Sequence, residues 1–457
     1  MGVETRVRSR SVPTWVWVGL AMLAMGVTTL WTLGDKTLSL DEGLTVGQSV
    51  RSLRIAVGTL RGEPNFTTYY VLIWIWSRFG DSEFWLRLPS VIFSVAAIPT
   101  CYALVARLIG RRAGISAAFV LAANPLLLAH AQDARPYALL LLTSLLSSLC
   151  FVIACERDTR DSWLAWSLAS VAALFVHPFA IFVIGAQSIW MWTFHRTNLR
   201  SGSFRLAMSI NVLGALAMGA LMALSYDHRV DWISPLSGSS ILDVLMSLVG
   251  VTSLFLLVLY LAAVVLGAVL NRSEHPQGIA FFGLLLLVPL AAALVVSIFK
   301  PLLIARYLII VVPAIAALAG AMVARVRSVY AVAVLAVFVA VVVPGYIEWR
   351  AEPDVGYDRI IEILTQKSHG GDMVISPPMI TSGLRYYTDD NSELQDVDFS
   401  FVFTGAVPDP RSLADRERVW QIYWRLGEWE RYKLPHRFDH SETMYANRFG
   451  LILNSDA

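Results

Sequence analysis

Residues 83–112 read EFWLRLPSVIFSVAAIPTCYALVARLIGRR, an apolar run that opens on a glutamate and ends in arginines. A helix that crosses a bilayer needs roughly 20 mainly apolar residues, and 83–106 meets this length. Arginines gather on the cytoplasmic side of membrane helices. The stretch therefore predicts a transmembrane helix whose second end, with Arg107, Arg111 and Arg112, faces the cytoplasm.

Apolar runs of similar length recur along the chain on both sides of this stretch. Of the 457 residues, 56% are hydrophobic and 15% charged, whereas a soluble protein averages about 25% charged residues. This composition predicts an integral membrane protein, and a net charge of +2 without a long basic run argues against nucleic-acid partners. We expect about eleven transmembrane helices, over residues 13–33, 83–106, 114–130, 137–154, 162–176, 178–194, 206–225, 241–270, 279–299, 303–323 and 328–346.

The charges of the connecting segments predict the orientation. With the N-terminus in the cytoplasm, most arginines fall in cytoplasmic segments and few in short outer turns, as the positive-inside rule requires. The basic segment before 13–33 is followed by no small-residue cleavage site, so we expect this helix to be retained. The arginines placed inside are Arg6, Arg8, Arg10, Arg107, Arg111, Arg112, Arg157, Arg160, Arg196, Arg200, Arg205, Arg272, Arg325 and Arg327.

The balance of charge changes near residue 346. Residues 347–457 contain 12 basic and 19 acidic side chains, whereas the whole chain has 36 and 34. We therefore expect a membrane domain over 1–346 and a soluble domain over 347–457. The soluble domain is expected on the extracytoplasmic side of the plasma membrane. In the second, an amphipathic helix, a Gly-Gly-Asp turn and strands over 418–424 and 442–454 predict a small α/β layer, which we interpret as a lid or acceptor-docking module.

The predicted topology gathers polar side chains at the outer face. An ionisable group there costs roughly 2–3 kcal/mol if it faces lipid, so it usually faces a cavity. The segment 34–82 predicts two interfacial helices that hold Asp41 just above the membrane boundary. The outer residues come from separate loops and helix ends: Asp41, Glu42, Glu63, Asn65, Asp81, Glu83, His130, Gln132, Asp133, Arg135, His177, Tyr226, Asp227, His228, Asp231, Lys300 and Arg306.

The cysteines and histidines form no established metal pattern. His228, with Asp227 and Asp231, could bind a divalent ion, but the spacing matches no known site. We therefore expect no cofactor, with a divalent metal at His228 as the alternative. The three cysteines lie in apolar runs, which predicts small core residues: Cys101, Cys150 and Cys155.

Several segments, in this order, resemble the GT-C class of membrane glycosyltransferases, in particular the branch of protein mannosyltransferases and aminoarabinose transferases. Those enzymes have a long outer loop that opens with Asp-Glu, an interfacial helix with a proline-aromatic start, and RLPS leading the second span. Where family members often read His-Pro-Pro, this chain has Glu63-Pro64-Asn65. The matching segments are Asp41-Glu42, EPNFTTYYVLIWIWSRFG (63–80), DSEFWLRLPSVIF (81–93), HAQDARPYALLLL (130–142), His177-Pro178 and KPLLIARYLIIVVPA (300–314).

The resemblance implies a GT-C-like helical membrane fold and the transfer of a sugar, of mannose or arabinose type, from a polyprenyl-phosphate donor. The acceptor would be a lipid, glycan or protein on the outer face. Because a lipid phosphate is already a good leaving group, the reaction needs one general base and cationic help for the phosphate. Asp41 is the candidate base, since a partly desolvated carboxylate becomes more basic, and its alternative role is to cap a helix that begins at Glu42.

Two basic residues near 300 are candidates for the donor phosphate. Arg306 lies a few residues into a predicted helix in an apolar run, where a guanidinium needs a partner, and a phosphate can accept two parallel hydrogen bonds from it. The alternative is that Arg306 snorkels to the outer interface. Lys300 is either a second phosphate contact or an interface anchor.

The remaining candidates have structural alternatives as well. Asp133 could cap the helix that follows, with Arg135 as its counter-charge, and Glu42 could pair with an arginine. His177 is either a structural hydrogen bonder or a substrate contact. The predicted substrate-binding residues are Glu42, Asn65, Tyr69, Gln132, Asp133, Arg135, His177, Lys300, Arg306 and Tyr307.

A polytopic lipid or glycolipid transporter or flippase is the competing function. Transporters commonly contain inverted repeats and ionisable groups at the midplane, in broken helices. This sequence has no evident repeat, and the interior of most predicted spans lacks charge. A non-catalytic scaffold would leave the outer polar residues unexplained, so we favour the glycosyltransferase.

Overall fold

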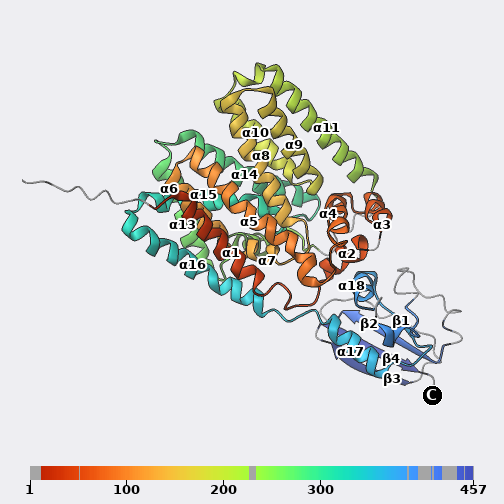
Figure 1. Cartoon of the computed structure of the whole chain (residues 1–457). Helices are drawn as coiled ribbons and strands as arrows, with labels where there is room; N and C mark the ends of the chain where they lie inside the picture. Colours follow the sequence, from red (N-terminus) through yellow and green to blue (C-terminus); the bar gives the residue numbers. More distant parts are fainter. Residues whose placement is uncertain are drawn as a thin grey trace, which may run out of the picture.

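The computed structural model describes residues 12–50, 52–225, 233–388, 391–399, 413, 416–424, 440–446 and 448–455. The described part is mainly helical and contains a four-stranded sheet. The helices form one elongated body, and the sheet with its two helices lies at one end of it (Figure 1). The predicted fold class, a polytopic helical membrane protein with a small C-terminal α/β part, is confirmed.

Seven of the described helices are long and apolar enough to cross a membrane, or eight if a bent pair counts as one span. The predicted number of about eleven is therefore not confirmed. The seven are α5 (Glu83–Leu108), α8 (Tyr137–Arg157), α11 (Gly202–Leu224), α13 (Leu254–Asn271), α14 (Pro276–Phe299), η3 with α15 (Tyr307–Val311 and Val312–Arg325) and α16 (Ser328–Ala351). Shorter helices of the same body are α1 (Thr14–Leu30), α9 (Arg160–Val176), α10 (Ala180–Phe194) and α12 (Gly238–Val249).

The predicted helix over 114–130 is wrong, because the chain bends there. It forms α6 (Arg111–Ala122) and α7 (Pro125–Ala131), whose axes differ by 60°. Pro125 has no N–H to continue α6, and the Asn124 side chain accepts a hydrogen bond from the Leu127 N–H at 3.0 Å, which starts a new helix.

The predicted helix over 241–270 is also wrong, since α12 ends and α13 begins inside it. Gly250 follows α12 with φ +76, a left-handed conformation that favours glycine. A Cβ at Gly250 would lie 2.2 Å from the Pro125 ring. The break in this pair of helices therefore packs against the bend between α6 and α7.

The outer segment contains α2 (Leu40–Ser49), α3 (Leu53–Gly58), η1 (Thr59–Arg61) and α4 (Pro64–Trp76). The first of the two predicted interfacial helices is thus two separate helices. Each begins at its own cap, because Ser39 accepts a hydrogen bond from Glu42 N–H and Ser52 accepts one from Ile55 N–H. A serine in this position satisfies an N–H that the first turn leaves unpaired.

The C-terminal layer, residues 357–455, contains α17 (Tyr357–Lys367), β1 (Met373–Ile375), α18 (Pro378–Thr388), η4 (Ser392–Leu394), β2 (Arg418–Trp424), β3 (His440–Ala446) and β4 (Phe449–Ser455). The strand order is β1-β2-β4-β3, with β1 parallel to β2 and the other pairs antiparallel. Trp420, Phe449 and Leu364 are buried in its core. The predicted helix and the strand over 418–424 are present, whereas the stretch predicted over 442–454 forms two antiparallel strands, β3 and β4. α16 runs past the predicted domain boundary at 346 to Ala351.

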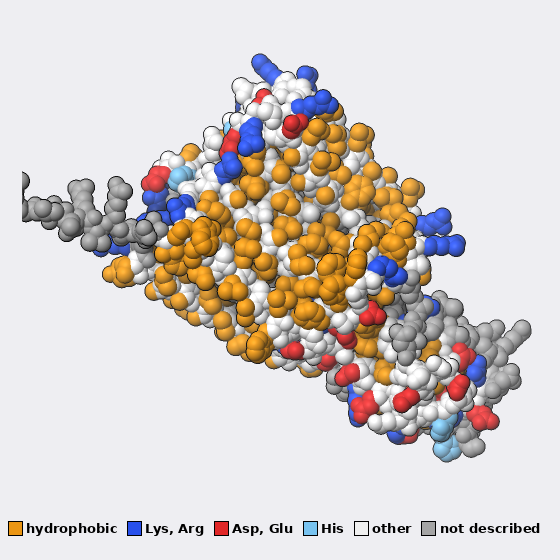
Figure 2. Space-filling model, in the orientation of Figure 1, with side chains coloured by type: hydrophobic (Ala, Val, Ile, Leu, Met, Phe, Trp, Pro, Cys, Tyr) orange, Lys and Arg blue, Asp and Glu red, His pale blue; other side chains and the backbone are white. Residues whose placement is uncertain are grey.

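The two ends of the helical body are richer in charged side chains than its middle (Figure 2). Figure 2 shows hydrophobic side chains across the body, with charged groups gathered toward its ends. α5 connects these ends, because Arg87 lies in its first turns and Arg107 in its last, about 30 Å apart along a helix. Arg107 forms an ion pair with Glu156, whereas Arg87 contacts the outer segment. The outer segment and the C-terminal layer therefore lie at the end opposite Arg107.

Candidate active site

Asp41 lies in the first turn of α2, but it does not cap the helix. The cap is Ser39, and Ser39 with Glu42 forms a capping box: the Ser39 hydroxyl accepts from the Glu42 N–H at 3.2 Å, and the Glu42 carboxylate accepts from the Ser39 N–H at 2.8 Å. The capping alternative for Asp41 is therefore wrong, because the position that needs a cap is two residues earlier. The Asp41 carboxylate is free to face the membrane helices.

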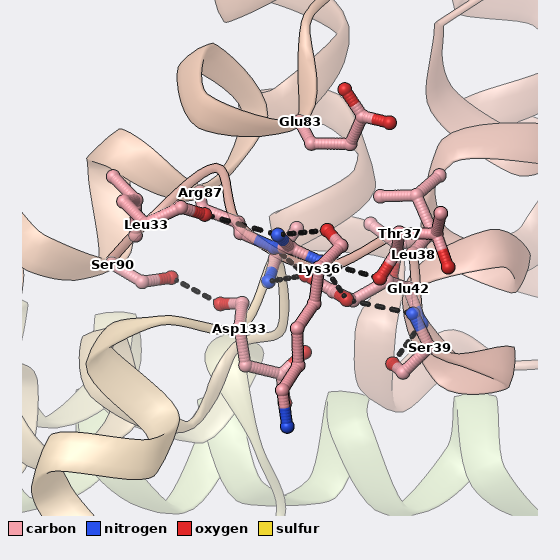
Figure 3. Close-up of polar contacts among 12 residues, drawn as sticks. Leu33, Lys36, Thr37, Leu38, Ser39, Glu42, Glu83, Arg87, Ser90 and Asp133 are labelled. Atoms are coloured by element: carbon pink, nitrogen blue, oxygen red, sulfur yellow. Dashed lines mark hydrogen bonds and ion pairs between the residues drawn. The ribbon is translucent and has the colours of Figure 1, made fainter. Parts of the chain in front are cut away.

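Glu42 forms a buried ion pair with Arg87 of α5. Both side chains are less than 5% exposed, and two hydrogen bonds of 2.7 and 2.8 Å join them (Figure 3). Glu42 also accepts from the Ala134 N–H at 2.9 Å. Together with the bond from Ser39, both oxygens of the Glu42 carboxylate are occupied, so the expected pairing with an arginine is present.

Arg87 also holds the chain that leads into α2. Its guanidinium donates to the backbone carbonyl oxygens of Leu33, Lys36 and Thr37 at 3.0, 2.8 and 2.9 Å. Figure 3 shows these contacts converging on one side chain. Glu42 and Arg87 therefore fix the start of α2 against the membrane helices.

Asp41 faces two arginines that come from other loops. Arg306 donates to the Asp41 carboxylate. Arg135 donates to the Asp41 carbonyl oxygen and to the Thr45 hydroxyl, both at 3.1 Å. Arg306 directly precedes η3, so the prediction that it lies within a helix is wrong. Asp41 and Arg306 are only partly buried, at 29% and 22% exposure.

The two arginines change the acidity of Asp41. Burial alone would raise the pKa of the Asp41 carboxyl, but the charges of Arg135 and Arg306, with the hydrogen bond from Arg306, hold that pKa below its ordinary value. The expectation that desolvation makes Asp41 more basic is therefore wrong for this structure, since charge attraction outweighs desolvation. Asp41 is ionised at neutral pH.

Aromatic rings surround the two arginines. The His177 ring lies 4.8 Å from the Tyr307 ring and 6.4 Å from the Tyr137 ring, measured between centroids. Arg306 lies 5.7 Å from the Tyr137 ring centroid, and Arg135 lies 4.5 Å from that of Phe66. These contacts form one cluster, which we call the arginine cluster. It consists of Asp41, Phe66, Arg135, Tyr137, His177, Arg306 and Tyr307.

His177 is a neutral member of this cluster. Burial, with the positive charges of Arg135 and Arg306, lowers the pKa of its imidazole to about 3. Its Nδ1 accepts a hydrogen bond from the Phe179 N–H at 3.3 Å, which fixes the ring. The imidazole therefore has a local structural partner and also contacts the site.

Asp133 does not cap α8, which begins after Pro136 without a side-chain cap. Its carboxylate lies 3.4 Å from His130, and burial raises the pKa of that carboxyl. Asp133 Oδ1, Arg135 Nε and the Tyr137 hydroxyl are buried and have no hydrogen-bond partner among the described residues. Buried polar atoms are normally satisfied, so these three atoms form a polar site whose partners are water or a bound molecule.

The other predicted residues lie around the arginine cluster or away from it. The Gln132 side chain accepts from Thr32 at 2.7 Å and donates to the Leu128 carbonyl oxygen at 3.2 Å, so it joins helices. The buried Tyr69 hydroxyl lies 3.2 Å from that of Ser90. Asn65 lies in the first turn of α4, and Lys300 follows the end of α14.

Sequence reasoning assigned no role to Arg87, Tyr137 or Phe66. All three lie in segments that carried the family resemblance, so the resemblance could have pointed to them, but nothing local indicated their partners. Tyr226, Asp227, His228 and Asp231 lie outside the described residues, and so do Arg6, Arg8 and Arg10. Within the described part of the chain, no group of three or more His, Cys, Asp or Glu side chains could hold a metal ion.

Comparisons with known proteins identify the fold. Residues 63–225 match the family described as "Dolichyl-phosphate-mannose-protein mannosyltransferase". The crystal structure of ArnT from Cupriavidus metallidurans bound to undecaprenyl phosphate aligns over 97% of this chain and 98% of its own, with 16% identity and a TM-score of 0.63. The chain has the GT-C fold. The predicted resemblance to the protein mannosyltransferase and ArnT branch is confirmed.

The GT-C fold is also shared with a more distant archaeal protein. The oligosaccharyltransferase AglB from Archaeoglobus fulgidus, in complex with an inhibitory peptide and a dolichol-phosphate, aligns over 89% of this chain and 69% of its own, with 10% identity and a TM-score of 0.55. A comparison with curated protein sequences found no match. The family match covers Arg87, Asp133, Arg135 and His177, while Asp41 and Arg306 lie outside it.

Proposed function

We propose that this protein transfers a sugar, of mannose or arabinose type, from a polyprenyl-phosphate donor to a hydroxyl of a lipid, glycan or protein acceptor. The arginine cluster carries this proposal, because it combines a carboxylate, two guanidinium groups and unsatisfied buried polar atoms at one end of a membrane body. The ArnT and AglB structures with the same fold contain undecaprenyl phosphate and a dolichol-phosphate, respectively. These ligands support a lipid-phosphate donor here.

Asp41 acts as the general base in this proposal. The acceptor hydroxyl gives its proton to the Asp41 carboxylate while its oxygen forms a bond to the anomeric carbon of the sugar. The bond between that carbon and the phosphate oxygen breaks, and the polyprenyl phosphate leaves with the electron pair. A single positioned base suffices because the phosphate is already a good leaving group.

Arg306 and Arg135 bind the donor phosphate and neutralise the charge that develops on it. Guanidinium groups suit this role because they offer paired hydrogen bonds to phosphate oxygens. Without donor, Arg306 is held by Asp41. A bound phosphate would compete with Asp41 for this guanidinium, which would weaken the ion pair and make the carboxylate a stronger base.

The other predicted residues contact the substrates in this proposal. Tyr307 and His177 of the cluster, with the neighbouring Asp133, would contact the sugar or its phosphate. Asn65, Tyr69, Gln132 and Lys300 are expected farther out. Glu42 holds α2 in place. We further propose that the N-terminus is cytoplasmic and the C-terminal domain extracytoplasmic. The positive-inside rule assigns Arg107 to the cytoplasmic side, and the arginine cluster lies at the opposite end of the helical body from the Arg107–Glu156 ion pair.

The test uses purified protein in nanodiscs, undecaprenyl-phosphate donors that carry radiolabelled mannose or arabinose, and a membrane glycolipid extract as acceptor. Wild type should transfer one of the two sugars, and Asp41→Asn should lose transfer while it still binds undecaprenyl phosphate. Asp161→Asn, an exposed carboxylate in the first turn of α9, is the matched control and should transfer normally.

Two outcomes would contradict the proposal. Intact transfer in Asp41→Asn would place the base elsewhere, with Asp133 next in line. If wild type neither binds nor consumes any donor, a lipid transporter or flippase becomes the better hypothesis. The same assay with an added chelator tests the expectation that no metal is needed. Loss of transfer in the presence of the chelator would overturn that expectation.

A further inference from the structure

The helix that carries Asp41 lies directly against the C-terminal layer. α2 is located between the membrane helices and α18, as Figure 1 shows. A Cβ at Gly43 would lie 2.9 Å from the Gly383 Cα, and one at Gly47 would lie 2.6 Å from the Ser382 Cβ. The two helices therefore approach each other backbone to backbone, at a distance that only glycine permits.

Asp41 and its contacts with the arginines lie on the face of α2 opposite to Gly43 and Gly47. Successive residues of a helix are about 100° apart, so Gly43 is about 200° around the helix from Asp41. Thr45 and Asp41 share one face, and both contact Arg135. Gly43 and Gly47 share the other. A change in the spacing between α2 and α18 would consequently move Asp41 toward or away from its arginines.

α18 is also tightly packed on the side that faces α17. A Cβ at Gly383 would lie 2.4 Å from the Tyr357 ring of α17. The Tyr357 hydroxyl donates to the Ile380 carbonyl oxygen at 3.3 Å. α18 is therefore held between α2 and the core of the C-terminal layer.

Polar contacts fix the chain just before α2 to the same layer and to the segment that leads into it. The Tyr387 hydroxyl accepts from the Leu38 N–H and donates to the Glu83 carboxylate, both at 2.9 Å. The Thr37 N–H donates to the Asp354 carboxylate at 2.9 Å. Tyr387 thus links three parts of the molecule: α18, the entry to α2 and the start of α5.

We propose that α18 is a positioning element, which sets the location of the Asp41 carboxylate through the contact of Gly43 and Gly47 with Ser382 and Gly383. This inference rests on the proposed function, because it gives the C-terminal layer a part in the chemistry of Asp41. The layer then acts on the catalytic step itself, in addition to any contact with an acceptor.

Gly43→Ala is the test variant, and Gly58→Ala is its matched control, since a Cβ at Gly58 meets nothing within 4 Å. With the donor that wild type uses, Gly43→Ala should lower kcat at least tenfold and change the KM for the donor less than threefold. The acid limb of its pH profile should move to lower pH, because the added methyl pushes α2 away from α18 and brings Asp41 closer to Arg135, Arg306 and His130, the groups that face it. Gly58→Ala should match wild type in both.

A second variant and a second readout address the case in which Gly43→Ala does not fold. Tyr387→Phe keeps the ring and removes the bonds to Leu38 and Glu83, and it should lower kcat several-fold at constant KM. Hydrogen–deuterium exchange should show faster exchange in α2 for both variants, and unchanged exchange in Gly58→Ala.

The outcomes separate the two proposals. If wild type transfers sugar and both variants match wild type in kcat, pH profile and exchange of α2, the positioning role is wrong while the proposed function stands. If wild type transfers nothing, the proposed function fails. In that case, unchanged exchange of α2 in the variants also overturns the contact between α2 and α18.

Discussion

Asp41 and Glu42 are adjacent carboxylates in the first turn of one helix, yet their surroundings differ. Glu42 is 3% exposed and both of its oxygens are occupied by Arg87 and by backbone N–H groups. Asp41 is 29% exposed, and its carboxylate meets Arg306 beside unsatisfied buried polar atoms. Glu42, whose contacts are saturated, anchors α2, whereas Asp41 keeps an exposed carboxylate that is available to a ligand.

The largest expected effect comes from breaking the anchor. Glu42→Ala leaves the Arg87 charge buried without its partner, which should destabilise the fold by about 3–5 kcal/mol. Thermal unfolding in detergent measures this as a lower midpoint, and activity should be lost with the fold. An unfolding midpoint equal to that of wild type would show that the pair is not an anchor.

Arg306→Ala should weaken the binding of the donor phosphate without unfolding the protein. Hydrogen bonds to charged groups contribute about 1.5–3 kcal/mol, so the affinity for undecaprenyl phosphate should fall roughly 10- to 100-fold. Arg272→Ala, an exposed arginine after α13, is the control in a titration of both variants. Equal affinity in the two would remove Arg306 from the donor site.

A smaller effect is expected on the pH dependence of the reaction, which reports the ionisation of Asp41. The pKa of Asp41 is held below its ordinary value by Arg135 and Arg306 once the opposing effect of burial is overcome. A base must be ionised, so kcat/KM of wild type should stay level through the range in which an ordinary aspartate titrates and fall only below it. Arg306→Ala raises the pKa and should move this acid limb to higher pH. A limb that stays in place would mean that another group titrates.

The smallest effect concerns His177. Because burial and two nearby arginines lower its pKa to about 3, the imidazole stays neutral between pH 5 and 8. His177→Asn should therefore leave the shape of the pH profile unchanged in that range, even if the rate falls. A limb near pH 6 that disappears in this variant would contradict the neutral assignment.

Much of the fold follows from local patterns in the sequence. Apolar runs predict the long helices, and the stretches at 418–424 and 442–454 predict strands. Two errors also had local signals: Ser39 precedes Glu42 in a capping-box spacing, and Pro125 marks the bend after α6. The prediction of one helix over 114–130 rested on hydrophobic length and ignored the proline, and the prediction for α2 placed the cap at Asp41 instead of Ser39.

The arrangement of the site could be predicted only in part. Topology placed Asp41, Arg135 and Arg306 on the same face, but the ion pair of Asp41 with Arg306 joins residues 265 positions apart. The sign of the Asp41 pKa shift depends on this pairing, so desolvation alone predicted the wrong direction. The contact of Gly43 with Gly383 likewise depends on how distant helices pack, which no local pattern encodes.

The most direct test of the two roles measures transfer and unfolding side by side in Asp41→Asn. We expect sugar transfer to fall about 10²- to 10⁴-fold, the range for a lost general base. The unfolding midpoint and the affinity for undecaprenyl phosphate should equal those of wild type. Transfer that persists at the wild-type rate, or an unfolding midpoint lowered as in Glu42→Ala, would contradict the assignment of Asp41 as the base.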